Sequence, residues 1–202
     1  MANRGRPKLY DRQAALHAAM LLFWQRGYLG ASMDELTKAM LMNRASVYAS
    51  FGDKRQLFLS CVDHYLETNG AAPFAALQKP RIADAIRGFF RAVVFNTTSA
   101  TTPGCLVASV LATAAGEEPE LREKLQACLA ITDRLLCARL SRAMAEGEVP
   151  LHVRPSRVAR LVNSLRHGLT VRARAGESRR ILLATADEAA DLVALTLRAS
   201  HA

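Results

Sequence analysis

The sequence predicts an all-α protein of about nine helices, and two observations support this fold class. Apolar residues recur at helical spacing in every long segment: Leu16, Ala19, Met20 and Phe23 stand at i, i+3, i+4 and i+7, which places them on one helix face. Runs with the alternating pattern of a strand are short. Half of the 202 residues are hydrophobic and 22% are charged, a composition that can build a core and is not typical of a disordered chain.

Helix starts and stops are marked most clearly in the first 60 residues. Asp11 is a predicted N-cap, and Gly27 is the predicted end of the first helix. Ser32 and Glu35 have the spacing of a capping box. Asn43 is the predicted cap of a short helix. The nine helices are expected at about residues 11–27, 32–40, 43–51, 53–68, 81–96, 105–115, 117–146, 155–175 and 179–199, with a loop at 69–80.

The second and third predicted helices and the short turn between them form a helix-turn-helix pattern. A short helix fits the major groove of DNA, which is roughly 12 Å wide. Arg44 could contact guanine or phosphate, Tyr48 could contact phosphate one turn later, and Lys54 could clamp another phosphate. The same pattern also fits an ordinary helical corner. The candidate DNA-contacting residues are Arg4, Arg6, Ser32, Asn43, Arg44, Ala45, Ser46, Tyr48, Ala49 and Lys54.

Positive charge is concentrated in the first part of the chain. Residues 1–60 carry a net charge of +5, whereas the other 142 residues carry +4. Such a surface attracts nucleic-acid phosphate or an anionic membrane. Arg4–Lys8, with the sequence Arg-Gly-Arg-Pro-Lys, has the form of an AT-hook core that could follow a narrow minor groove. A basic tail with nonspecific phosphate attraction is the equal alternative.

Several other function classes lack their signatures in the sequence. The cysteines at 61, 105, 128 and 137 form no CxxC pair, so buried, inert thiols are expected, and a switch operated by oxidation of Cys105 or Cys128 is the alternative. No nucleophile elbow, phosphate-binding glycine loop or metal-ligand cluster is present, so we expect neither an enzyme nor a metal or cofactor. Without an apolar run of about 20 residues, we expect a cytoplasmic protein with no membrane partner.

The first 60 residues contain several motifs that are found together in one protein family. Residues 18–30 end in Phe23–Trp–Gln–Arg–Gly–Tyr28, the stretch Ser32–Leu36 follows, and residues 39–58 contain Tyr48, Phe51, Lys54, Leu57 and Phe58 at the recurring spacing. On these residues the chain resembles the TetR family of transcriptional regulators. Pro103–Leu106 and Gly168–Gly176 resemble segments of one branch of that family. The chain departs from the pattern at Leu41, where glycine is usual, and at Ala49, where a larger polar residue is common.

The resemblance implies three parts: a flexible basic arm at 1–9, a helix-turn-helix domain at 10–56, and an effector-binding and dimerisation domain at 57–202. It also implies a repressor that binds a palindromic operator as a homodimer through residues 155–199 and is released by a small molecule. The last predicted helix has more apolar positions than one buried face needs, which favours such a partner. The candidate effector-pocket residues, for each of which core packing is the alternative, are Phe89, Phe90, Val93, Cys105, Leu106, Cys128, Asn163 and His167.

A different class of function is the remaining alternative. A basic helical module could bind apolar small molecules or an anionic membrane surface without reading specific DNA. Loss of DNA binding in variants of Arg44 and Tyr48, with ligand or vesicle binding unchanged, would separate the two hypotheses.

Overall fold

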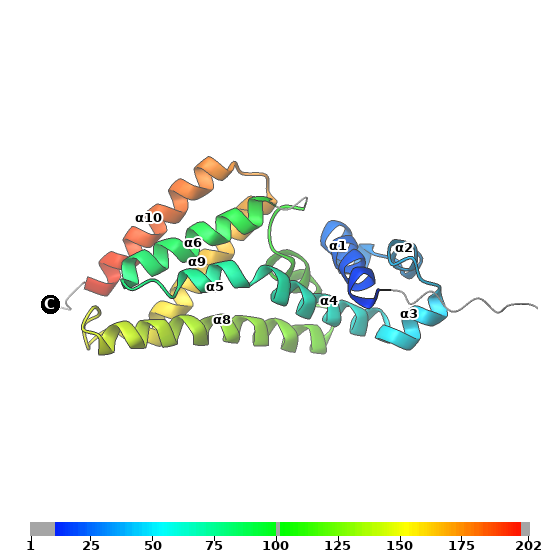
Figure 1. Cartoon of the computed structure of the whole chain (residues 1–202), viewed down its shortest axis with the longest axis horizontal. Helices are drawn as coiled ribbons and strands as arrows, with labels where there is room; N and C mark the ends of the chain where they lie inside the picture. The colour runs from blue at the N-terminus through cyan, green and yellow to red at the C-terminus, as the bar shows by residue number, and fades with distance from the viewer. Residues whose placement is uncertain (1–10, 100–101, 199–202) are drawn as a thin grey trace, which may run out of the picture. The chain divides into compact units, whose positions relative to one another are not determined.

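The computed structural model describes residues 11–99 and 102–198, and these residues form helices and no strand (Figure 1). The predicted all-α fold class is confirmed. Contacts divide the chain into two compact units, which we call the head (residues 1–64) and the body (residues 65–202). None of the described helices is long and apolar enough to cross a membrane. The helices are α1 (Arg12–Gly30), α2 (Met33–Ala39), α3 (Arg44–Phe51), α4 (Lys54–Asn69), α5 (Ala71–Ala76), α6 (Ile82–Ser99), η1 (Val107–Leu111), α7 (Ala112–Ala114), α8 (Pro119–Ala145), α9 (Pro155–Arg174) and α10 (Arg179–Arg198).

The residues that begin the head helices are those that the sequence predicts, whereas α1 continues past its predicted end at Gly27 to Gly30, with a kink at Gly27. The Asp11 carboxylate accepts hydrogen bonds from the backbone N–H groups of Gln13 and Ala14. Ser32 and Glu35 form both bonds of a capping box at the start of α2. The Asn43 side-chain oxygen accepts from the N–H of Ser46 at 2.8 Å and so caps α3. These bonds satisfy N–H groups that a helix cannot pair within itself, and therefore fix where each helix begins.

Two elements differ from the sequence prediction. Segment 69–80 was expected to be a loop, but it contains α5. Four of the six α5 residues are alanine, the strongest helix former, and Pro73 lies in the first turn, where its missing N–H removes no helical hydrogen bond. A single helix was expected at 105–115, whereas the structure has the π-helical turn η1 followed by the short helix α7.

The head is organised around an aromatic cluster. The ring centroid of Phe58, from α4, lies 4.9 Å from that of Phe23 and 5.0 Å from that of Tyr28, both from α1. All three rings are buried. Val47 and Phe51 on the inner side of α3 are buried as well, so the short helix α3 is held by its apolar side.

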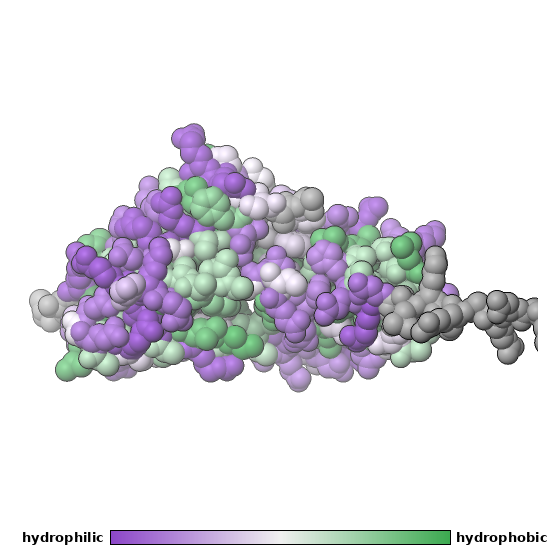
Figure 2. All heavy atoms as spheres, viewed as in Figure 1, coloured by the Kyte–Doolittle hydropathy of each residue, from purple (hydrophilic) through white to green (hydrophobic). Residues whose placement is uncertain are grey.

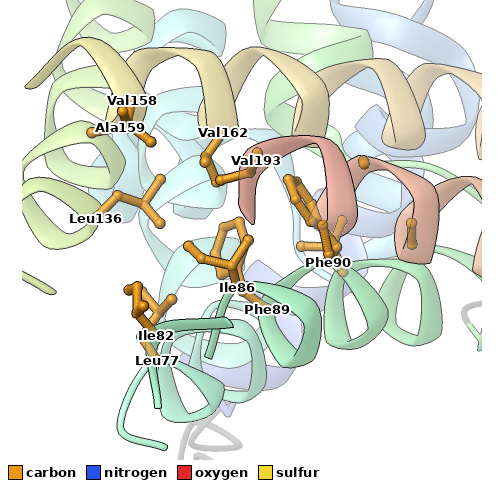
Figure 3. Packing of buried hydrophobic residues seen from close by; sticks show 14 of the residues in the cluster. Leu77, Ile82, Ile86, Phe89, Phe90, Leu136, Val158, Ala159, Val162 and Val193 are labelled. Carbon is orange, nitrogen blue, oxygen red and sulfur yellow. The ribbon is translucent and has the colours of Figure 1, made fainter. Parts of the chain in front are cut away.

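The body has one continuous apolar core formed mainly by α6, α8, α9 and α10. Figure 3 shows Ile86 and Phe89 of α6 together with Leu136 of α8, Val162 of α9 and Val193 of α10. Helix α6 packs against α10, and α8 packs against α9. On the visible outer surface, polar residues surround separate apolar patches (Figure 2).

A buried arginine holds α8 to the segment between α5 and α6. Arg139 is 5% exposed, and its guanidinium lies 3.7 Å from the Glu148 carboxylate. A buried charge is costly unless it is paired and hydrogen-bonded, and here both conditions are met. The guanidinium also donates to the backbone carbonyls of Leu77, Lys79 and Pro80.

The turn between α2 and α3 places a leucine in an unfavourable backbone conformation. Leu41 has φ of 53° in the left-handed region and its side chain is 92% exposed. Its N–H donates to the carbonyl of Lys38, and the N–H of Met42 donates to that of Thr37, which is the Schellman pattern of a helix end. The turn therefore has the conformation that glycine adopts without steric cost, although the residue is leucine.

Replacement of Leu41 by glycine is expected to stabilise the head. The left-handed conformation costs a non-glycine residue about 1–2 kcal/mol, and glycine loses part of that gain through the greater entropy of its unfolded chain. Leu41→Gly should raise the free energy of unfolding by about 0.5–1 kcal/mol. Denaturant unfolding followed by the fluorescence of Trp24, the single tryptophan, would measure the change. Leu41→Ala removes the same exposed side chain but keeps the strain, so an equal gain in that variant would contradict this explanation.

Candidate nucleic-acid interface and ligand cavity

Helix α3 has one buried face and one exposed face. Val47 and Phe51 point into the head, whereas residues 44, 45, 48 and 49 are exposed. These exposed positions lie at i, i+1, i+4 and i+5, which is one side of a helix. Tyr48 is 43% exposed and is therefore not a core residue. The outer face carries one cation, one phenol and two small alanines.

Arg44 lies at the first position of that face. Its guanidinium is 3.6 Å from the Asp34 carboxylate of α2 and 5.9 Å from the ring centroid of Tyr48. Both members of the ion pair are mostly exposed. Surface pairs of this kind contribute only about 0–1 kcal/mol, so the guanidinium can leave Asp34 for a phosphate or a base edge at little cost.

Two of the predicted contact residues already serve as helix caps. The hydroxyl of Ser32 donates to Glu35 at 2.8 Å, and the backbone and side-chain hydrogen bonds from Ser32 lower the pKa of the Glu35 carboxyl. The Asn43 side-chain oxygen is bonded to the N–H of Ser46, which is half-buried. Ser32 and Asn43 therefore position α2 and α3, and Asn43 retains its amide N–H groups for other partners.

Lys54 is held at the start of α4. Its ammonium lies 5.0 Å from the centre of the Tyr28 ring and 3.5 Å from the carbonyl oxygen of Leu29. Lys54 is therefore not a freely solvated charge. Arg4 and Arg6 lie outside the described residues.

The body contains a cavity lined by both apolar and polar side chains. Phe74, Phe89 and Val93 form part of the wall, and Tyr65 and Arg166 are among the polar residues that line it. The space open to the centre of a water molecule is about 70 Å³, compared with the roughly 10–15 Å³ that one water needs. The cavity therefore has room for a small organic molecule or several waters.

The residues predicted for an effector pocket fall into two groups. Phe89, Val93, Cys105 and Cys128 line the cavity. The other four residues are not among those that line it. Phe90 packs in the body core, and Leu106 is fully buried just before η1. The Asn163 amide donates to Asp133 and to the carbonyl of Leu129 in α8, and the His167 ring bonds to Arg166.

Sequence reasoning missed Tyr65 and Arg166 as lining residues. Arg166 occupies a position in the apolar stripe of α9, between Val162 and Leu169, at the i+4 spacing where another apolar residue would continue the buried face. A cation in an apolar stripe was the available signal. Tyr65 gave none, because a tyrosine in the apolar face of a helix is also typical of a core.

Arg166 dominates the electrostatics of the cavity lining around it. Its Nε–H donates to Asn163 Oδ1 at 3.0 Å, and its Nη2 is 2.8 Å from His167 Nε2. Burial and the charge of Arg166 lower the pKa of His167 to about 4. His167 is therefore neutral near pH 7, and its Nε2 accepts the hydrogen bond. Burial and the neighbouring Cys105 raise the pKa of Tyr65 well above its usual value, although the charge of Arg166 lowers it. In the part of the chain that the structure describes, no group of three His, Cys, Asp or Glu side chains could hold a metal.

Comparison with known families matches both parts of the chain. Residues 15–61 match the model described as bacterial regulatory proteins of the tetR family. Residues 80–189 match the model described as a tetracyclin repressor-like C-terminal domain.

Individual relatives cover most of the chain. The HTH-type transcriptional repressor ComR of Escherichia coli K12 is 33% identical over 179 residues, which is 87% of this chain and 85% of ComR. A cysteine variant of the TetR family regulator CifR, solved with a 26-base-pair operator duplex, is 34% identical with a TM-score of 0.86 over 92% of this chain and 98% of CifR. Reduced NemR of E. coli, at 20% identity and a TM-score of 0.75 over 90% of this chain and 94% of NemR, shares the fold. The chain therefore belongs to the TetR family of bacterial regulatory proteins.

Proposed function

We propose that this chain is a transcriptional repressor that binds a palindromic operator as a homodimer and leaves it when a small molecule occupies the cavity of the body. The exposed face of α3 carries the proposal. Arg44, Ala45, Tyr48 and Ala49 lie together on a short helix whose other side is fixed in the head. Arginine can bind guanine or phosphate, tyrosine can bind phosphate, and alanine permits close approach to thymine methyl groups.

The relatives support a repressor that reads DNA. ComR, which aligns with most of this chain, is named a transcriptional repressor. CifR was solved on operator DNA, and its similarity extends through head and body alike. A basic module that does not bind specific DNA would have no reason to resemble both a repressor and a regulator solved on its operator.

A dimer surface is proposed on α9 and α10. The outward positions of α10 include Ile181, Leu192 and Leu195, all exposed in the single chain and spaced to lie on one helix face. Helix α9 adds the exposed Leu161 and, at helical spacing, Gly168, where an added Cβ would meet nothing within 4 Å. Exposed apolar side chains beside a residue without a side chain suit the close packing of helices between two copies.

Helix α4 offers a route for regulation. It begins with Lys54, and Tyr65 and Asn69 near its end line the cavity. Asn96 of α6, another lining residue, donates to the carbonyl of Asn69 at 2.7 Å. A ligand that contacts these residues differently in two positions of α4 would shift the balance between DNA-bound and released states.

The DNA proposal predicts a sequence preference that depends on α3. Selection from random duplexes at about 0.15 M salt, where nonspecific phosphate binding is weakened, should enrich a palindrome. A specific contact is worth about 1–3 kcal/mol, so Arg44→Ala with Tyr48→Ala should lower affinity for the enriched duplex by about 100-fold in a fluorescence-anisotropy titration. Arg134→Ala, which removes an exposed charge from α8, is the control. Unchanged affinity in the double variant, or binding to anionic vesicles in place of any enriched DNA, would contradict the proposal.

The dimer proposal predicts that a bulky residue at position 168 separates the two copies. The single chain accommodates a side chain there, and glycine is a poor helix former, so Gly168→Arg should leave the chain folded. Sedimentation equilibrium should show a dimer for the unmodified protein and a monomer for this variant. Ala138→Arg, at an exposed position of α8, should remain dimeric. A dimeric Gly168→Arg protein would place the interface elsewhere.

A further inference from the structure

We propose that the body cavity binds a small organic monocarboxylate, with Arg166 as its anion-binding residue. That this ligand releases the protein from DNA rests on the proposed function. The binding site itself is inferred from the charges and contacts of the body alone. A neutral apolar effector is the principal alternative.

Arg166 is a cation without an acidic partner among the described residues. Its hydrogen bonds go to the Asn163 amide oxygen and to the neutral His167 ring. The nearby carboxylate of Asp133 instead accepts from the Asn163 amide at 2.7 Å. Arg139, a buried arginine of the body, has Glu148 as its counterion. A half-buried guanidinium with only neutral partners favours an anion brought in by a ligand.

The guanidinium retains the donors that a carboxylate needs. Arginine has five N–H groups, and the bonds to Asn163 and His167 use one on Nε and one on Nη2. Three N–H groups remain on Nη1 and Nη2, the two nitrogens whose parallel N–H bonds match the two oxygens of a carboxylate. Asn163 and His167 hold the guanidinium in place without neutralising it, so they act as positioning residues.

The rest of the cavity limits the size and polarity of the ligand. The walls include Phe74, Phe89 and Val93, and the volume suits a molecule of only a few non-hydrogen atoms. A buried neutral phenol, Tyr65, lies close enough to Arg166 for that charge to influence its pKa. The predicted ligand is therefore a short or singly ringed carboxylate, whose acidic group would lie beside Arg166.

Binding of matched acids and amides tests the assignment. Isothermal titration calorimetry of the full chain without DNA would compare benzoate with benzamide and butanoate with butanamide. At least one acid should bind with a Kd below about 10 mM, and its amide should bind at least about 10-fold more weakly. Arg166→Gln should weaken binding of the acid at least about 10-fold and leave binding of the amide unchanged. Arg166→Lys, which keeps the charge but loses the paired N–H bonds, should fall between.

The controls separate a lost site from a lost fold and from a failure of the proposed function. Arg134→Gln removes a charge from exposed α8 and should bind the acid like the unmodified protein, and circular dichroism should show equal helix content in all variants. Equal binding of acids and amides, no binding of either acid, or unchanged acid binding in Arg166→Gln would overturn the proposal. Acid binding that depends on Arg166 but does not release the selected DNA would support the anion site and count against effector release.

Discussion

The burial of one side of α3 is the constraint on which the proposed DNA-reading surface of the head depends. Helix α3 has eight residues, and a helix of that length is marginal in isolation. Val47 and Phe51 attach it to the head core, and the Asn43 cap sets its first turn. Once those contacts fix the rotation of the helix, the side chains at 44, 45, 48 and 49 must face solvent together. The proposed reader is thus a consequence of which residues are buried.

The body uses charge in two contrasting ways. Arg139 is enclosed by three backbone carbonyls and Glu148, so its charge is neutralised and serves to join α8 to the α5–α6 connection. Arg166 is held by an amide and a neutral imidazole at the wall of the cavity, so its charge remains available. The second arrangement costs stability unless an anion completes it, and natural proteins keep such costs mainly where they serve function.

Local signals in the sequence predict most of the head. Asp11, Ser32 with Glu35, and Asn43 each mark a helix start through a side chain that bonds the next turn, and these contacts span only a few residues. The left-handed conformation of Leu41 is harder to predict from the sequence, because leucine, unlike glycine, does not favour it. The short helix α5 was missed because Gly70 and Pro73 indicate a break, whereas the alanines around them favour helix.

The residues that line the cavity are far apart in the sequence, so no local sequence pattern predicts it. Its lining comes from α4, α5, α6, α8 and α9 and from the segment around η1, so it exists only after these elements pack. Phe89 and Phe90 are adjacent and equally apolar, yet only Phe89 lines it. Cys105 and Cys128 both reach the cavity, and control by their oxidation stays a hypothesis.

Photocrosslinking can show whether the outer face of α3 contacts the bases of the operator. A benzophenone amino acid at Ala49, on the outer face of α3, would be compared with one at Ile131, which is exposed on α8. With the selected duplex, we expect crosslinks from position 49 to bases in the major groove of each half-site and none from position 131. Retained DNA binding without crosslinks from position 49, or equal crosslinks from both positions, would show that another surface contacts the DNA.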